Sequence, residues 1–171
     1  MSAVRIFRIA PISLLVIGLA CGDDEPAGPA TSFSADLSGD EEVPAVTTDA
    51  TGSAELTLSG NQLTYTIEVE NLQNAAVAHI HIAPAGQNGP VRLNLCGTGA
   101  PQPACTSGTG VLAAGTNGTT VGTPAITFDS LLSAMRTGGA YVNVHTNATG
   151  CTPGEQGCNP AGEIRGQVSA N

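Results

Sequence analysis

The sequence predicts an all-β fold, a single Greek-key or immunoglobulin-like β-sandwich with one short helix near residues 129–136. Apolar and polar residues alternate with a period of two along many short segments, which is the pattern of half-buried strands. Glycine is abundant, with 22 residues in 171, and turn residues separate the segments at intervals typical of sandwiches. A helical period occurs over one short stretch only. These three observations favour a single domain built from strands.

The expected strands follow one another along the chain. The first lies at 33–37, where every second residue is apolar and therefore shares one face of the strand. The next two occupy 54–58 and 63–69, and the S-G-N between them is typical of a β-hairpin. The same alternation predicts six further strands, at 77–82, 91–96, 109–114, 123–128, 140–146 and 163–169.

The one helical stretch is D-S-L-L-S-A-M-R at 129–136. Asp129 is expected to cap its N-terminus, and Arg136 suits the negative end of the helix dipole. Gly138 can adopt the left-handed conformation that ends a helix. The sequence therefore predicts a helix of two turns before the strand at 140–146.

The N-terminus predicts a bacterial lipoprotein signal peptide at residues 1–20. Arg5 and Arg8 precede an apolar stretch of about 12 residues, which is too short to span a bilayer stably. The G-L-A-C ending resembles a bacterial lipobox, in which Cys21 is acylated and becomes the mature N-terminus. Residues 21–32 are then a flexible tether, and residues 33–171 form the domain. An ordinary signal peptide with a coincidental cysteine is the alternative.

The mature chain is strongly acidic. After loss of residues 1–20, three arginines and no lysine oppose 14 acidic residues, a net charge of −11. Such a surface repels nucleic acid and anionic lipid headgroups. We therefore expect no nucleic-acid partner, and attachment to the membrane through lipid at Cys21. The expected location is the bacterial cell envelope, on the extracytoplasmic side.

Four cysteines remain in the predicted domain, and an even number in an oxidising compartment predicts two disulfides. Pairing Cys96 with Cys105 and Cys151 with Cys158 is favoured, because each pair brackets one loop rich in glycine and proline. A zinc site with four cysteine ligands is the alternative, but the chain has no C-x-x-C spacing.

All three histidines lie in two strand-like segments, A-H-I-H-I at 78–82 and Y-V-N-V-H-T at 141–146. His79 and His81 share one face of their strand, and His145 shares a face with Tyr141 and Asn143. Three imidazoles suit copper or zinc and leave an open coordination position. If the strands are neighbours, a metal site results. The alternative is a set of partly buried histidines, hydrogen-bonded to Tyr141, Asn143 or the backbone.

The last strand, G-E-I-R-G-Q-V, has Ile164 and Val168 on its core face and Glu163, Arg165 and Gln167 on the other. The simplest role for Arg165 is an ion pair with Glu163 or a neighbouring acidic residue. If the strand lies beside the histidines, Glu163 or Arg165 would instead support the metal, by fixing a ring tautomer or attracting an anion.

The acidic cluster Asp40–Glu42 is expected in a solvated turn. Pro44 follows it and marks a strand edge or bulge, because proline cannot donate a ladder hydrogen bond. Calcium binding is the alternative, although calcium loops space their ligands alternately around a tight turn.

Six short motifs follow one another along the chain, and these are L-S-G-D-E-E-V-P-A-V at 37–46, T-G-S-A-E-L-T-L at 51–58, A-H-I-H-I at 78–82, N-G-P-V at 88–91, G-G-A-Y-V-N-V-H-T at 138–146 and G-E-I-R-G-Q-V at 162–168. Together they resemble the CHRD domain family, named for chordin and common in bacterial exported proteins. The resemblance covers about 33–168. It implies an extracytoplasmic all-β module and no particular reaction. The two cysteine-closed loops look like insertions relative to the family pattern.

A more local similarity concerns copper–zinc superoxide dismutases, which hold copper with an H-x-H strand, a late histidine and a nearby arginine. His79, His81, His145 and Arg165 follow that order. The chain departs from the pattern because it has no fourth histidine and no segment like the zinc-binding loop. The sequence also has no G-x-S-x-G motif, which would indicate a nucleophilic hydrolase. We therefore expect a non-catalytic binding or structural module of the envelope. The alternative is a three-histidine copper or zinc site that serves metal binding or dismutase-like redox activity.

Overall fold

The computed structural model describes residues 29–98, 101–116, 125–147 and 151–171. These residues form nine strands, one α-helix and one 3₁₀ turn, which confirms the predicted all-β class with one short helix. In chain order the elements are β1 (Ser32–Ser38), η1 (Gly39–Glu41), β2 (Thr51–Ser59), β3 (Gln62–Leu72), β4 (Ala75–Ile82), β5 (Val91–Cys96), β6 (Gly108–Thr116), α1 (Phe128–Arg136), β7 (Ala140–Thr146), β8 (Ile164–Gln167) and β9 (Ser169–Ala170). The predicted signal peptide, Cys21 and most of the tether lie outside the described residues.

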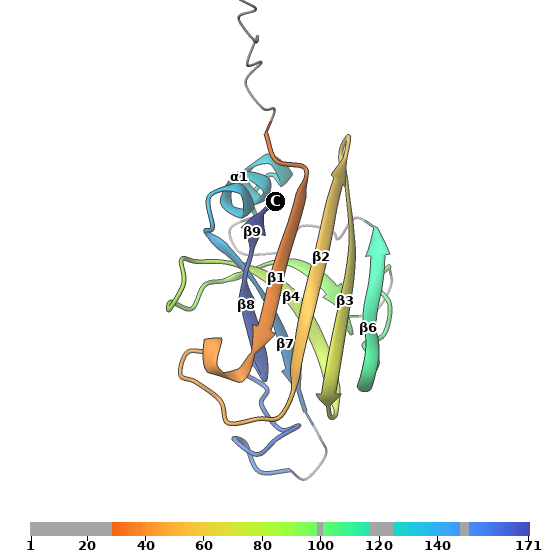
Figure 1. Cartoon of the computed structure of the whole chain (residues 1–171), viewed down its shortest axis with the longest axis vertical. Coiled ribbons are helices and arrows are strands. Elements are labelled where there is room, and N and C mark those ends of the chain that lie inside the picture. The colour runs from red at the N-terminus through yellow and green to blue at the C-terminus, as the bar shows by residue number, and fades with distance from the viewer. Residues whose placement is uncertain (1–28, 99–100, 117–124, 148–150) are drawn as a thin grey trace, which may run out of the picture.

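The strands join in one antiparallel sheet, in the order β5-β4-β7-β8-β1-β2-β3-β6, and β9 pairs with β1. The sheet curls, so that β4 and β7 lie behind β1, β2 and β3 in Figure 1. Near its two ends, the Tyr65 hydroxyl of β3 donates to the Leu95 carbonyl of β5 at 2.5 Å. The sheet therefore nearly closes on itself. The predicted two-sheet Greek-key sandwich is not confirmed, because the strand pairing is continuous.

The core lies inside the curled sheet, and the period-two alternation explains its composition. Phe33 and Leu37 of β1 are buried, whereas Asp36 between them is exposed. The helix α1 adds Leu131 and Met135 to the same core. In Figure 1 the helix lies at the end of the molecule where β1 begins.

Strand β7 is buried along its whole length, on both faces. Its Val142 and Val144 belong to the core, so its other face must be covered by something else. Loops provide that cover, and the Asn88 side chain joins two of them by donating to the Val43 carbonyl at 2.6 Å. The face that carries the histidines is therefore the outer face of the sheet, beneath a layer of loops.

Two local predictions are wrong. The strand expected at 123–128 does not form in its described part, because 125–127 has no regular structure and Phe128 begins α1. The helix is capped by Thr127, whose side chain accepts a hydrogen bond from the Ser130 amide at 3.2 Å. Asp129 therefore lies inside the first turn, where an acid still favours the positive end of the helix dipole. Gly138 is left-handed as predicted, with φ +67°.

Both predicted disulfides are present. Cys96 is bonded to Cys105 with a Cα–Cα distance of 5.2 Å, and Cys151 to Cys158 with 5.8 Å. These bonds leave no free thiolate for the alternative four-cysteine zinc site. The described part of the chain contains no helix that is both long and apolar enough to cross a membrane.

Candidate metal centre

The pairing of β4 with β7 brings the three histidines together. In this antiparallel register His79 lies opposite Asn143, His81 opposite Tyr141, and His145 opposite Val77. Directly opposed residues point to the same face, so all three imidazoles project from one side of the sheet. The condition set by the sequence, that the two strands be neighbours, is therefore met.

The three rings lie close enough to share one ion. Their centroids are 5.0 Å apart for His79 and His145, 5.7 Å for His79 and His81, and 5.8 Å for His81 and His145. Each ring offers one nitrogen, and these nitrogens lie within 4.8 Å of one another. Three bonds of 2.0–2.1 Å to zinc would need nitrogens roughly 3.4 Å apart, so the rings would have to move closer together to bind one ion. Among the described residues this is the one such group of histidine, cysteine or acidic side chains.

Backbone carbonyls orient two of the rings. His81 Nδ1 lies 2.8 Å from the Gly89 carbonyl oxygen, and His145 Nδ1 lies 3.1 Å from the Pro160 carbonyl oxygen. A carbonyl only accepts, so Nδ1 carries the proton in both rings and each neutral ring keeps its lone pair on Nε2. This is the usual arrangement of a histidine that binds metal through one nitrogen.

Three buried histidine nitrogens have no hydrogen-bond partner among the described residues. They are Nδ1 of His79, Nε2 of His81 and Nε2 of His145. Buried polar atoms are paired in the great majority of cases, and each exception needs an explanation. The alternative of purely structural, hydrogen-bonded histidines accounts for the Nδ1 atoms of His81 and His145. It leaves these three nitrogens unexplained.

The surroundings favour the neutral form of all three rings. The pKa of His79 and that of His81 are each lowered to about 4, and burial is the largest cause for both. The other two histidines contribute to the lowering for His79, whereas His145 and Arg165 contribute for His81, against the hydrogen bond to Gly89. Burial also lowers the pKa of His145, against the hydrogen bond to Pro160. At neutral pH the lone pairs are therefore free of protons that would compete with a metal.

Residues 33–168 match the CHRD domain family. The chain belongs to this family. A search of curated proteins finds no match. Within this CHRD domain, β4, β7 and β8 carry three of the six family-like motifs, and the loops that cover the histidines carry two more.

Tyr141 and Arg165 form one wall of the CHRD-domain site. The Tyr141 ring stacks on His81, with centroids 4.9 Å apart and planes within 13°. The Arg165 guanidinium lies 3.5 Å from the centre of the Tyr141 ring, a cation–π contact. Arg165 also donates to the Gln87 carbonyl at 2.9 Å and to Asn88 Oδ1 at 3.3 Å. It therefore holds the loop between β4 and β5, which carries the Gly89 carbonyl.

The expected ion pair between Arg165 and Glu163 is not formed, although the structure describes both residues. The Glu163 carboxylate accepts four hydrogen bonds from neutral donors instead, which are Thr48 Oγ1, Thr146 Oγ1, the Gly157 amide and Asn159 Nδ2. Backbone carbonyls, and not Glu163 or Arg165, contact the Nδ1 atoms of His81 and His145. Both residues hold loops that carry those carbonyls.

Glu42 is a buried residue of the site that sequence reasoning missed. The sequence predicts that Glu42 lies in a solvated turn, yet its side chain is 7% exposed, and Asn143 Nδ2 donates to its Oε2 at 3.5 Å. Burial raises the pKa of Glu42 to about 7, although the Arg165 charge acts in the opposite direction. The local sequence does not distinguish Glu42 from its neighbours, because it is the last of three consecutive acidic residues. The other two, Asp40 and Glu41, are exposed.

Proposed function

We propose that this CHRD domain is a non-catalytic binding module whose ligand is a copper or zinc ion held by His79, His81 and His145. The observation that carries the proposal is the cluster of three histidines, each of which offers one nitrogen within 4.8 Å of the others. Each ring also has one buried nitrogen without a hydrogen-bond partner among the described residues. A bound metal would occupy a lone pair of all three rings at once. Imidazole is a ligand that both metals accept.

The site is suited to hold a metal without a large change of structure. Two rings already present Nε2, because the Gly89 and Pro160 carbonyls hold the protons on Nδ1. Such partners fix ring orientation and raise the basicity of the ligand. Three protein ligands leave one position open for water or an exogenous group.

We further propose that the protein is attached to the bacterial cell envelope by lipid at Cys21. The basic and apolar residues 1–20 and the G-L-A-C ending support this location. Two disulfides are also typical of proteins exported to an oxidising compartment. Nothing favours dismutase-like chemistry over simple metal binding, since the chain has no fourth histidine for a second metal.

Titration of the purified mature protein with Cu²⁺ and Zn²⁺ tests the proposal. We expect one ion per chain, and affinities lower by at least about 100-fold in His79→Ala, His81→Ala and His145→Ala alike. Glu68→Gln is the control, because this exposed acid reports non-specific binding to an acidic surface. Histidine variants that bind as tightly as the parent would show that the rings are structural.

A further inference from the structure

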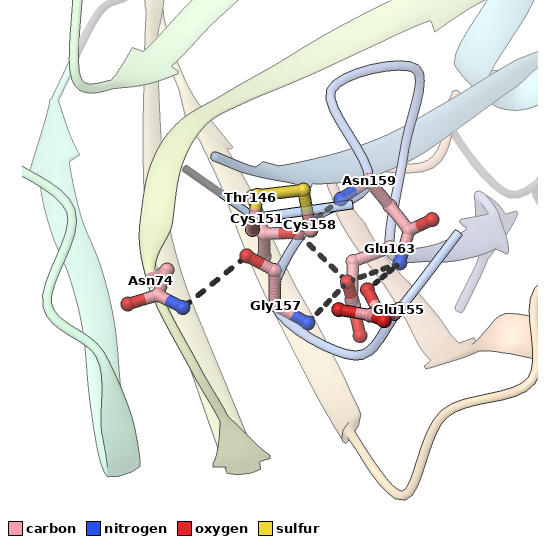
Figure 2. The surroundings of a disulfide bond; sticks show 8 residues. All are labelled: Asn74, Thr146, Cys151, Glu155, Gly157, Cys158, Asn159 and Glu163. Atoms are coloured by element: carbon pink, nitrogen blue, oxygen red, sulfur yellow. Dashed lines mark hydrogen bonds between the residues drawn. A yellow bond between two sulfur atoms is a disulfide. The ribbon is translucent and has the colours of Figure 1, made fainter. Parts of the chain in front are cut away.

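The loop that follows β7 carries the carbonyl that orients His145. His145 lies next to the end of β7, and Pro160 lies 15 residues later. The position of the Pro160 carbonyl therefore depends on what holds this loop against the strand. Figure 2 shows that its hydrogen bonds converge on Glu163, beside the Cys151–Cys158 disulfide.

Glu163 is a fully buried carboxylate without a cationic hydrogen-bond partner among the described residues. Its Oε2 accepts from Asn159 Nδ2 at 2.6 Å, from Thr146 Oγ1 at 2.7 Å and from the Gly157 amide at 3.0 Å. Its Oε1 accepts from Thr48 Oγ1, which belongs to the loop between η1 and β2. One carboxylate thus joins the end of β7 to two separate loops.

Asn159 connects the Glu163 hydrogen bonds to Pro160, the next residue in the chain. The Asn159 amide donates to Thr146 Oγ1 at 2.9 Å, and the Thr146 amide donates to the Asn159 carbonyl at 3.2 Å. This reciprocal pair fixes Asn159 beside the residue that follows His145. The Asn159 carbonyl also accepts from the Gly162 amide at 3.0 Å, which closes the turn that contains Pro160.

The Cys151–Cys158 disulfide also restrains the turn that precedes Asn159. Cys158 directly precedes Asn159 and is buried, and its amide donates to the Glu155 carbonyl at 2.9 Å. Asn159 Nδ2 donates to that carbonyl as well, at 3.0 Å. The turn 154–159 therefore has little freedom to move relative to Glu163.

We infer that Glu163 is a positioning residue for the metal centre: by holding Asn159 and Thr146, it places the Pro160 carbonyl on His145 Nδ1 and keeps His145 Nε2 directed at His79 and His81. The inference rests on the proposed metal-binding function. Glu163 touches none of the ligand nitrogens and acts through the loop. Removing a group that hydrogen-bonds directly to a metal ligand lowers metal affinity by about 10- to 100-fold, and loss of Glu163 would act by displacing such a group, the Pro160 carbonyl.

The test compares Zn²⁺ affinity in four mature proteins, which are the parent, Glu163→Ala, Glu163→Gln and Glu155→Gln. Glu163→Ala should bind about 10- to 100-fold more weakly, even at temperatures where it is fully folded. Glu163→Gln should restore most of the affinity. Its amide oxygen can accept at the Oε2 position, and its NH₂ group can donate to the Thr48 hydroxyl. Glu155→Gln controls for charge, because Glu155 is an exposed acid in the same loop.

A spectroscopic readout separates positioning from stability. Co²⁺ in place of Zn²⁺ should give an altered visible absorption spectrum in Glu163→Ala, and the parent spectrum in Glu163→Gln. If Glu163→Ala does not fold, Thr146→Val removes one bond to Glu163 and the acceptor of the Asn159 amide, and it should show the same loss of affinity. A folded variant of either kind with parental affinity overturns the inference. A parent protein that binds no metal overturns the proposed function itself.

Discussion

His81 and Gly89 are in direct contact at the rim of the metal centre, where His81 Nδ1 lies 2.8 Å from the Gly89 carbonyl oxygen. Gly89 is held from its other side, since its amide donates to the Tyr141 hydroxyl at 3.0 Å. It also lies tightly against the end of β4. A Cβ atom at this position would collide with the Ile82 carbonyl and lie 2.9 Å from Ala83 Cβ. Only glycine allows this close approach of the loop to the strand.

Gly89→Ala should therefore weaken metal binding. The added methyl group must push the loop away from β4, and the carbonyl that fixes the His81 tautomer would move with it. We expect a loss of about tenfold or more in Zn²⁺ affinity, measured by competition with a chelator. Gly139→Ala is the matched control, because a Cβ there has its nearest contact at 3.5 Å. Equal affinity in the two variants would contradict the role of the Gly89 carbonyl.

Glu42→Gln should stabilise the metal-free domain above neutral pH. The pKa of Glu42 is raised from 4.5 to about 7 by burial, so the stabilisation associated with its protonated form is complete below about pH 4.5 and is lost as the pH rises through 7. Glutamine stays neutral, and its NH₂ group can donate to Oδ1 of Asn143, which has no hydrogen-bond partner among the described residues.

Urea unfolding of the metal-free parent and Glu42→Gln at several pH values checks this. The free energy of unfolding of the variant, relative to the parent, should grow between about pH 4.5 and pH 7 and then level off. The increase should be on the order of 1–3 kcal/mol. Contributions from the histidines are common to both proteins and cancel in the difference. A difference that does not change with pH would show that Glu42 is ionised or solvated throughout.

The two disulfides should differ in their effect on metal binding. Each closes a short loop, so replacing either pair with alanine should lower the free energy of unfolding by about 2–3 kcal/mol without abolishing the fold. Only Cys151→Ala/Cys158→Ala should also weaken Zn²⁺ binding, because that bridge borders the turn carrying Pro160. Calorimetric titration of both double variants compares them directly. Equal loss of affinity in both would indicate a general effect of stability.

Cys21 should carry lipid in the mature protein. Two or three acyl chains hold a protein stably at a membrane, whereas one chain gives marginal binding. We expect the protein to partition into detergent, and Cys21→Ser to be released or to remain unprocessed. Intact-mass spectrometry of the purified protein measures both the N-terminus and the lipid. A mature chain that starts elsewhere and has no lipid mass would contradict this prediction.

Features that depend on neighbouring residues could be predicted from the sequence. The alternation at 78–82 places His79 and His81 on one face because successive strand residues point to opposite sides. The turn residues between Cys151 and Cys158 predict a loop short enough for the observed disulfide. The sequence predicts the helix at nearly its observed residues. It predicts Asp129 as the cap where the structure has Thr127, because both residue types can accept the capping hydrogen bond.

Features that depend on pairing between distant segments were decided by the tertiary structure. The sequence allowed β4 and β7 to be neighbours, but only their register places His145 beside His79. Glu42 and Asn143 are 101 residues apart, and the burial of Glu42 arises from loops that fold over the outer face of the sheet. Local periodicity determines which way a side chain points. Long-range packing determines which chain segments cover that side chain, and the period-two pattern does not predict those segments.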